Sequence, residues 1–254
     1  MEGVRILVHA VRMVLGNLNT VLRISGAWLV IMVVLGLMAG ESYFETGIDR
    51  GTQMPSFEPV LFVLGFSKII FGLWIAVAWH RYILLEERPG AFLPQWRGGA
   101  IWSYFKAGFV IVLIMILMII PMSIVFGFVM VPIYGSGGNS LAAGLLFFLT
   151  LGLPAAYVFY RISPMLPSAA VGDRLPVKQA WAGTRSSGLA FISLTIVTVI
   201  LGYVIQLPAQ ILASTALPVA VIWSAVAQWV STVVGASIIT TIYGHYVQKR
   251  ELNA

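Results

Sequence analysis

The sequence predicts an all-α integral membrane protein: a bundle of six transmembrane helices, paired as three hairpins, with amphipathic helices on the cytoplasmic side. Hydrophobic residues make up 59% of the chain and charged residues 9%, and the charges fall between long apolar runs. A helix needs about 20 mostly apolar residues to cross a hydrocarbon core of about 30 Å. Because runs such as 110–120 are apolar on every face, they fit helices and not the alternating strands of a barrel.

The six spans lie within a single transmembrane domain that covers the whole chain. We place them at about residues 24–40, 60–79, 102–133, 141–160, 189–207 and 219–243.

Residues 1–20 predict an amphipathic helix in the membrane interface. Arg5, His9 and Arg12 recur at i, i+4 and i+7, and valines and leucines form the opposite face. This pattern predicts contacts of Arg5 and Arg12 with phospholipid headgroups. Two further stretches, 87–97 and 176–185, precede the second and third hairpins. They are either ordinary interfacial linkers or, with the first, signs of a unit of about 85 residues repeated three times.

The third span is long for a bilayer. Its 32 residues, 102–133, make a straight helix of about 48 Å. Pro121 in this span and Pro154 in the fourth predict helix breaks. Either Pro121 kinks a continuous helix, or residues 122–133 fold back against protein. Broken helices can line a binding site, as in transporters, whereas the commoner effect of a proline inside a span is a plain kink.

Basic residues predict the orientation, because cytoplasmic loops are enriched in Lys and Arg. The outer side holds Arg50 with Glu41, Glu45, Asp49 and Glu58. Thirteen of the 15 basic residues share the other side: Arg5, Arg12, Arg23, Arg81, Arg88, Arg97, Lys106, Arg161, Arg174, Lys178, Arg185, Lys249 and Arg250. Both termini are therefore expected in the cytoplasm. The basic residues are dispersed along one membrane face, which speaks against nucleic acid as a partner. The first apolar run, 17 residues long, exceeds the usual 7–15 of a signal peptide, so we expect no cleavage.

Nothing in the sequence predicts catalysis, a metal site or a cofactor. No span carries Asp or Glu, the chain has no cysteine, and its three histidines fall near span ends. Apart from Lys106 in the first turns of the third span, Lys68 is the one charge inside a span. We expect it to snorkel, with its ammonium directed toward the outer face. The alternative is a buried functional charge.

Small residues at four-residue spacing predict helix packing. Gly36 and Gly40 form one such pair, and Ala227, Ser231 and Gly235 form a row in the last span. Such faces let helices approach closely, within the bundle or against a second copy or a partner membrane protein. Three glutamines are expected to hydrogen-bond between helices: Gln206, Gln210 and Gln228.

One segment resembles a known family. Within residues 161–184 a span end, a proline-rich step and an amphipathic helix follow one another, with Arg161, Pro167, Val171, Ala180, Trp181 and Thr184 at the matching positions. The pattern is similar to YciC-type inner-membrane proteins and to the membrane domain found with glycerophosphodiester phosphodiesterases. The resemblance implies an α-helical protein of the bacterial inner (cytoplasmic) membrane and brings no catalytic residue.

Two functions fit this sequence. The first is a non-enzymatic interaction or accessory component that contacts membrane phospholipids and partner helices, because apolar and small-residue faces dominate the spans. The second is a carrier or channel for a lipid or other amphipathic small molecule, which would use Pro121, Pro154 and Lys68. A cavity that converges on Lys68 would favour the second function, and a solid bundle would favour the first.

Overall fold

All the regular secondary structure in the part of the chain that the structure describes is helical. The computed structural model describes residues 1–44, 59–90, 93–135 and 140–252, and no strand occurs in these ranges. Six helices are long and apolar enough to cross a membrane, judged by length and composition. These spans are Leu18–Ala39, Pro59–Leu85, Gly98–Met130, Ala142–Val171, Gly188–Leu212 and Leu217–Val247. The predicted all-α fold with six spans is therefore confirmed, and the protein is a multi-pass membrane protein.

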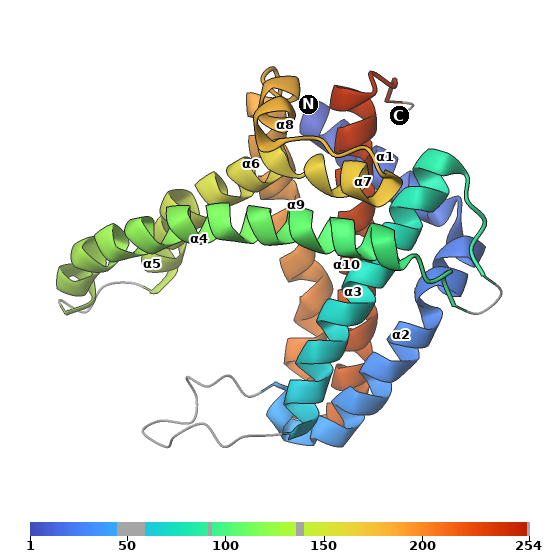
Figure 1. Cartoon of the computed structure of the whole chain (residues 1–254). Coiled ribbons are helices and arrows are strands. Elements are labelled where there is room, and N and C mark those ends of the chain that lie inside the picture. Colours follow the sequence, from blue (N-terminus) through green and yellow to red (C-terminus); the bar gives the residue numbers. More distant parts are fainter. Residues whose placement is uncertain (45–58, 91–92, 136–139, 253–254) are drawn as a thin grey trace. The chain divides into compact units, whose positions relative to one another are not determined.

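Figure 1 labels the helices in chain order. In chain order they are α1 (Glu2–Leu15), α2 (Leu18–Ala39), η1 (Gly40–Tyr43), α3 (Pro59–Leu85), α4 (Gly98–Gly135), α5 (Ser140–Phe147), η2 (Phe148–Gly152), α6 (Leu153–Ile162), α7 (Met165–Val171), α8 (Val177–Gly183), α9 (Gly188–Leu212), α10 (Leu217–Ile242) and η3 (Tyr243–Val247).

The described connections differ in part from the predicted ones. α1 and α8 form within the predicted first and third amphipathic stretches, but the second stretch has no helix in its described residues. α9 continues through Pro208, and backbone N–H groups of Thr215 and Ala216 donate to the Leu212 carbonyl at 3.1 and 2.8 Å to close a short turn. The outer-side residues Glu45, Asp49, Arg50 and Glu58 lie outside the described residues.

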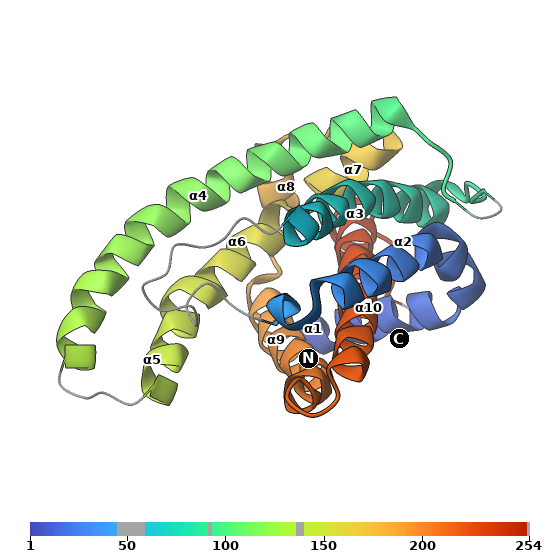
Figure 2. The same cartoon turned by 90° about the horizontal axis from the view of Figure 1, so that it is seen from below.

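Pro121 does not interrupt its helix. α4 is helical from Gly98 to Gly135, and Figure 2 shows it as one curved rod. The fold-back of residues 122–133 is therefore wrong, and Pro121 is not a break. Backbone polar groups cannot be left unsatisfied in lipid, so an apolar segment keeps its helical hydrogen bonds and bends where proline removes one.

Pro154 coincides with an irregular turn. η2 is one turn of π-helix that ends at Gly152, and Pro154 stands in the first turn of α6. Proline has no N–H to donate to the carbonyl four residues earlier, and single π-turns are a common way for a helix to absorb such a defect. The Thr150 hydroxyl donates to the Leu146 carbonyl at 2.6 Å in the same turn.

The chain divides into two compact units. Unit 1 comprises Met1–His9, Trp102–Thr198 and Ile238–Ala254, and unit 2 comprises Ala10–Ile101 and Val199–Ser237. Each is described separately below. That the chain forms a single domain stays a prediction.

Unit 2 is built from α2, α3 and the adjoining parts of α9 and α10, which run side by side in Figure 1. Polar contacts join the helices, among them a hydrogen bond from the Trp223 indole of α10 to the Ile205 carbonyl of α9 at 2.7 Å. The Trp229 indole donates to the Ser25 hydroxyl at 2.7 Å, and the Tyr82 hydroxyl donates to the Asn17 side-chain carbonyl at 2.7 Å. The apolar core that these helices share is made of Val14, Val21, Ile24, Trp28, Met32, Ile75, Trp79, Ala225, Val233 and Ala236.

Unit 1 contains the long helix α4 with α5 beside its C-terminal part, as both views show. The Phe126 and Phe147 rings meet edge to face at 5.6 Å between these helices. The start of α1 packs on α9, because a Cβ at Gly3 would stand only 2.2 Å from the Ala190 carbonyl oxygen. Phe191 of α9 is fully buried.

Candidate functional site: a polar cavity around Lys68

Lys68 lines a cavity that lies wholly within unit 2. Its side chain is half-buried in the third turn of α3. The cavity has a volume of about 440 Å³, which falls within the usual 300–1,000 Å³ of small-molecule sites. Residues near η1 and on α3, α9 and α10 line it: Ser42, Tyr43, Phe44, Leu61, Leu64, Gly65, Lys68, Gln206, Ala209, Gln210, Ser224 and Gln228.

Tyr43 reaches the cavity because of two glycines. Gly40 has φ +58° and ends α2, with its backbone N–H donating to the Gly36 carbonyl. η1 then brings the Tyr43 ring over Gly36, where an added Cβ would stand 3.2 Å from the ring and 2.8 Å from the Val221 Cγ1 atom. Gly36 therefore makes room for both η1 and α10. Gly40 has open space around its Cβ position, so it terminates a helix and is not a packing residue.

The contacts among the polar groups around Lys68 are long. The Lys68 ammonium lies 5.9 Å from the centroid of the Tyr43 ring. The Tyr43 hydroxyl donates to the Ser224 hydroxyl at 3.4 Å, a long hydrogen bond. Lys68 forms no ion pair with any residue that the structure describes. The predicted direction of its ammonium, toward the outer face, stays a prediction.

Three glutamines meet at this cavity, but their contacts differ from the predicted ones. Gln228 Nε2 donates to the Thr232 hydroxyl of its own helix at 3.5 Å. Gln206 and Gln210 form no side-chain hydrogen bond with another described residue. The prediction of hydrogen bonds between helices is therefore wrong for this part of the chain. The carboxamides line a cavity instead, where they can hydrogen-bond to a ligand or to water.

Only one residue of the predicted small-residue row on α10 is buried. Ala227 is buried, whereas Ser231 is exposed and Gly235 has open space at its Cβ position. Each step of four residues rotates about 40° around a helix of 3.6 residues per turn, so the row drifts by about 80° from end to end. Ser231 and Gly235 are therefore not packing residues in the described structure.

Arg5 and Arg12 are exposed on α1, and so are the apolar side chains of Val8 and Leu15. The buried face of this helix consists of Ile6, Leu7, Ala10 and Val14. An exposed surface that mixes arginines with apolar groups suits the interface of a membrane. The contact of Arg5 and Arg12 with headgroups stays a prediction.

The two proline regions border a second cavity, in unit 1, of about 340 Å³. Pro121, Phe126 and Met130 of α4 face Leu146 and Thr150 across it. The Thr150 hydroxyl is engaged by its own helix. This groove is therefore apolar in effect, and it lacks the charge and carboxamides of the Lys68 cavity.

Four of the six residues that carry the family resemblance, Arg161, Ala180, Trp181 and Thr184, meet in unit 1. Arg161 is buried and donates from Nε to the Thr184 hydroxyl at 2.9 Å, from Nη1 to the Tyr157 hydroxyl at 2.8 Å and from Nη2 to the Trp181 carbonyl at 2.6 Å. Its guanidinium also stacks 4.1 Å from the centroid of the Trp181 ring. Thr184 donates to the Ala180 carbonyl at 2.9 Å. This cluster joins α6 to α8.

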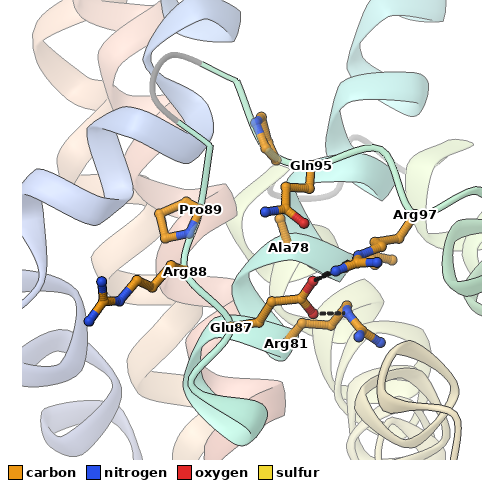
Figure 3. Close-up of a pocket in the computed structure, with 9 residues that line it drawn as sticks. Ala78, Arg81, Glu87, Arg88, Pro89, Gln95 and Arg97 are labelled. Atoms are coloured by element: carbon orange, nitrogen blue, oxygen red, sulfur yellow. Dashed lines mark hydrogen bonds and ion pairs between the residues drawn. The ribbon is translucent and has the colours of Figure 1, made fainter.

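A glutamate holds the connection between α3 and α4. As Figure 3 shows, Glu87 lies between Arg81 and Arg97, and Arg88 points away from them. Arg81 Nε donates to one carboxylate oxygen at 2.5 Å, and Arg97 Nε donates to the other at 2.7 Å. Partial burial raises the pKa of Glu87, but the hydrogen bonds and charges of Arg97 and Arg81 outweigh it and lower the pKa. The adjoining cavity, about 20 Å³, holds about one water molecule.

Tyr43 and Ser224 were missed at the level of sequence. For Ser224 the sequence does hold a pattern that indicates the site. Gln206 and Gln210 are four residues apart on α9, and Ser224 and Gln228 are four apart on α10. Residues at this spacing share one helix face. Polar pairs on two apolar spans indicate a shared polar surface.

No protein family, curated protein or solved structure matches this chain in the comparisons. The described helices are those of an all-helical, multi-pass membrane protein, with a polar cavity lined by residues of one compact unit. Among the described residues, no three His, Cys, Asp or Glu side chains gather in a group that could hold a metal ion.

Proposed function

We propose that this protein is a non-enzymatic carrier or binding protein for an amphipathic molecule of the membrane. The observation that carries the proposal is the cavity on Lys68, which combines a charge and carboxamides with apolar walls. The described lining contains no Asp, Glu, His or Cys, so its possible acid–base groups are limited to Lys68 and Tyr43. Binding of a polar headgroup beside an apolar chain suits this lining better than a reaction does.

A second candidate is an interaction or accessory role, for which α4 provides the support. Only 6% of its most apolar stretch is buried within the structure, and Leu117 and Phe128 are 74% and 80% exposed. In a bilayer this surface would contact lipid tails, a second copy or a helix of a partner membrane protein.

We also propose a bacterial inner-membrane location with both termini in the cytoplasm. The distribution of Lys and Arg supports the orientation. The resemblance to YciC-type proteins supports the location, and the cluster around Arg161 gives that pattern a physical role.

The carrier proposal is tested by what stays bound to the protein. The full chain is purified in mild detergent, and co-purifying lipids and small molecules are identified by mass spectrometry. Gly65 lines the cavity and has open space at its Cβ position, so Gly65→Leu should fill the cavity and remove the bound molecule. Gly26 on α2 also has open space but is not part of the cavity lining, and Gly26→Leu is the control. An identical set of bound molecules in all three proteins contradicts the proposal.

A further inference from the structure

We infer that the cavity around Lys68 selects a ligand whose headgroup is a singly charged oxyanion, such as a carboxylate or a phosphodiester. The inference rests on the proposed function, because it names the chemistry of the ligand that the same cavity would take.

The described lining of the cavity carries a single positive charge. Lys68 is the only charged residue among the described residues that line the cavity. The Tyr43 ring is centred 5.9 Å from the Lys68 ammonium, close to the limit of about 6 Å for a cation–π contact. A cation inside a span is costly unless it is paired. An anionic headgroup would supply the partner that the described residues do not.

Hydrogen-bond donors share the cavity with the Lys68 ammonium. Gln206 and Gln210 lie one turn apart on α9, and neither carboxamide is hydrogen-bonded to another described side chain. Each amide offers two N–H donors. The hydrogen bond between the Tyr43 and Ser224 hydroxyls is long, at 3.4 Å. Either hydroxyl can therefore exchange it for a shorter bond to a ligand. Donors beside a single ammonium suit an oxyanion, and one ammonium matches one negative charge.

The apolar part of the lining makes the ligand amphipathic. Phe44, Leu61, Leu64 and Ala209 share the cavity with the polar groups. A free inorganic anion would leave these side chains unused, whereas an alkyl chain would bury against them. Fatty acids and anionic phospholipids share the required headgroup chemistry.

Headgroup charge is the variable that tests this inference. The purified full chain, in a nonionic detergent at pH 7.5, is titrated with decanoate, decanol and decylamine, which share one chain length. Short-chain phosphatidylglycerol and phosphatidylcholine form a second matched pair. Binding is measured from the rise in the thermal unfolding midpoint. We compare wild type, Lys68→Met, Lys68→Arg and a control, Lys106→Met, whose lysine lies in unit 1 and outside the cavity.

Decanoate or phosphatidylglycerol should raise the midpoint more than its neutral, cationic or zwitterionic match. Lys68→Met should weaken this binding about ten- to hundredfold, while Lys68→Arg and Lys106→Met should retain most of it. Preference for decanoate would point to a fatty acid, and preference for phosphatidylglycerol to a phospholipid.

Equal binding of decanoate, decanol and decylamine, unaffected by Lys68→Met, would overturn the charge selection but leave a ligand in the cavity. Failure of every probe, together with unchanged co-purifying molecules in Gly65→Leu, would instead overturn the proposed function. If Lys68→Met does not fold, the headgroup series on wild type and Lys68→Arg still decides the inference.

Discussion

Replacing Arg161 with methionine tests the cluster that joins α6 to α8. The variant removes three hydrogen bonds from a guanidinium that is 4% exposed. Hydrogen bonds that involve a charged group contribute about 1.5–3 kcal/mol each, and a desolvated cation–π contact contributes about 2 kcal/mol. Burial of the charge offsets several kcal/mol of this sum. The expected net loss of stability is therefore about 2–4 kcal/mol.

Thermal unfolding in detergent measures this loss. For a chain of this size, 1 kcal/mol corresponds to about 2–4 °C, so the midpoint should fall by about 5–15 °C. Arg161→Lys keeps the charge but cannot reach three acceptors or stack as a plane, so it should also lower the midpoint. Thr184→Val keeps the shape and leaves the Nε donor without its acceptor, at a cost of about 1–3 kcal/mol.

The double variant separates a specific contact from general damage. Once Arg161 is methionine, Thr184→Val removes no bond to the guanidinium, so the two losses should add to less than their sum. Strict additivity of the two changes, or an unchanged midpoint in Arg161→Met, would refute the reasoning.

Gly36→Ala should lower the unfolding midpoint by forcing α2 away from α10, at about 1–3 kcal/mol, whereas Gly26→Ala should not lower it. Glu87 has a pKa below its ordinary 4.5, so its ion pairs stabilise the fold above pH 4.5 and are lost as the pH falls through the folded pKa. The midpoint of Glu87→Gln should then depend less on acid than that of wild type, and parallel curves would contradict this. With no native cysteine, cysteine at exposed Ser214 should react with an impermeant thiol reagent from outside and cysteine at exposed Ser186 should not; the reverse would invert the orientation.

The number and order of the spans could be predicted, because length and apolarity alone decide whether a helix can cross a bilayer. Their ends could not. The predicted fifth span ends at residue 207, whereas α9 continues through Pro208, since one lost hydrogen bond in a long helix is cheap compared with exposed backbone in lipid. At Pro121 the sequence left a kink and a break open, and the commoner kink is the one that fits the continuous α4.

The candidate site was predicted only in part. Lys68 stood out as the one charge far from the cytoplasmic end of its span. Tyr43 did not, because its place depends on the left-handed turn at Gly40 and on the absence of a side chain at Gly36. Its partner Ser224 is 181 positions away along the chain, and no local pattern relates the two residues. The sequence predicts that the three glutamines hydrogen-bond between helices, whereas in the described structure they line the cavity.

The length of α4 has a consequence for the bilayer itself. Its apolar stretch of 33 residues is about 50 Å long, so a hydrocarbon core of about 30 Å would require a tilt of about 50°. Helices in membranes tilt by about 0–40°. The bend of α4 and local thickening of the surrounding lipids would take up the remaining length, so the chain should partition toward bilayers with longer acyl chains. Lipid chain length then becomes a variable that sets the angle of this helix in the membrane.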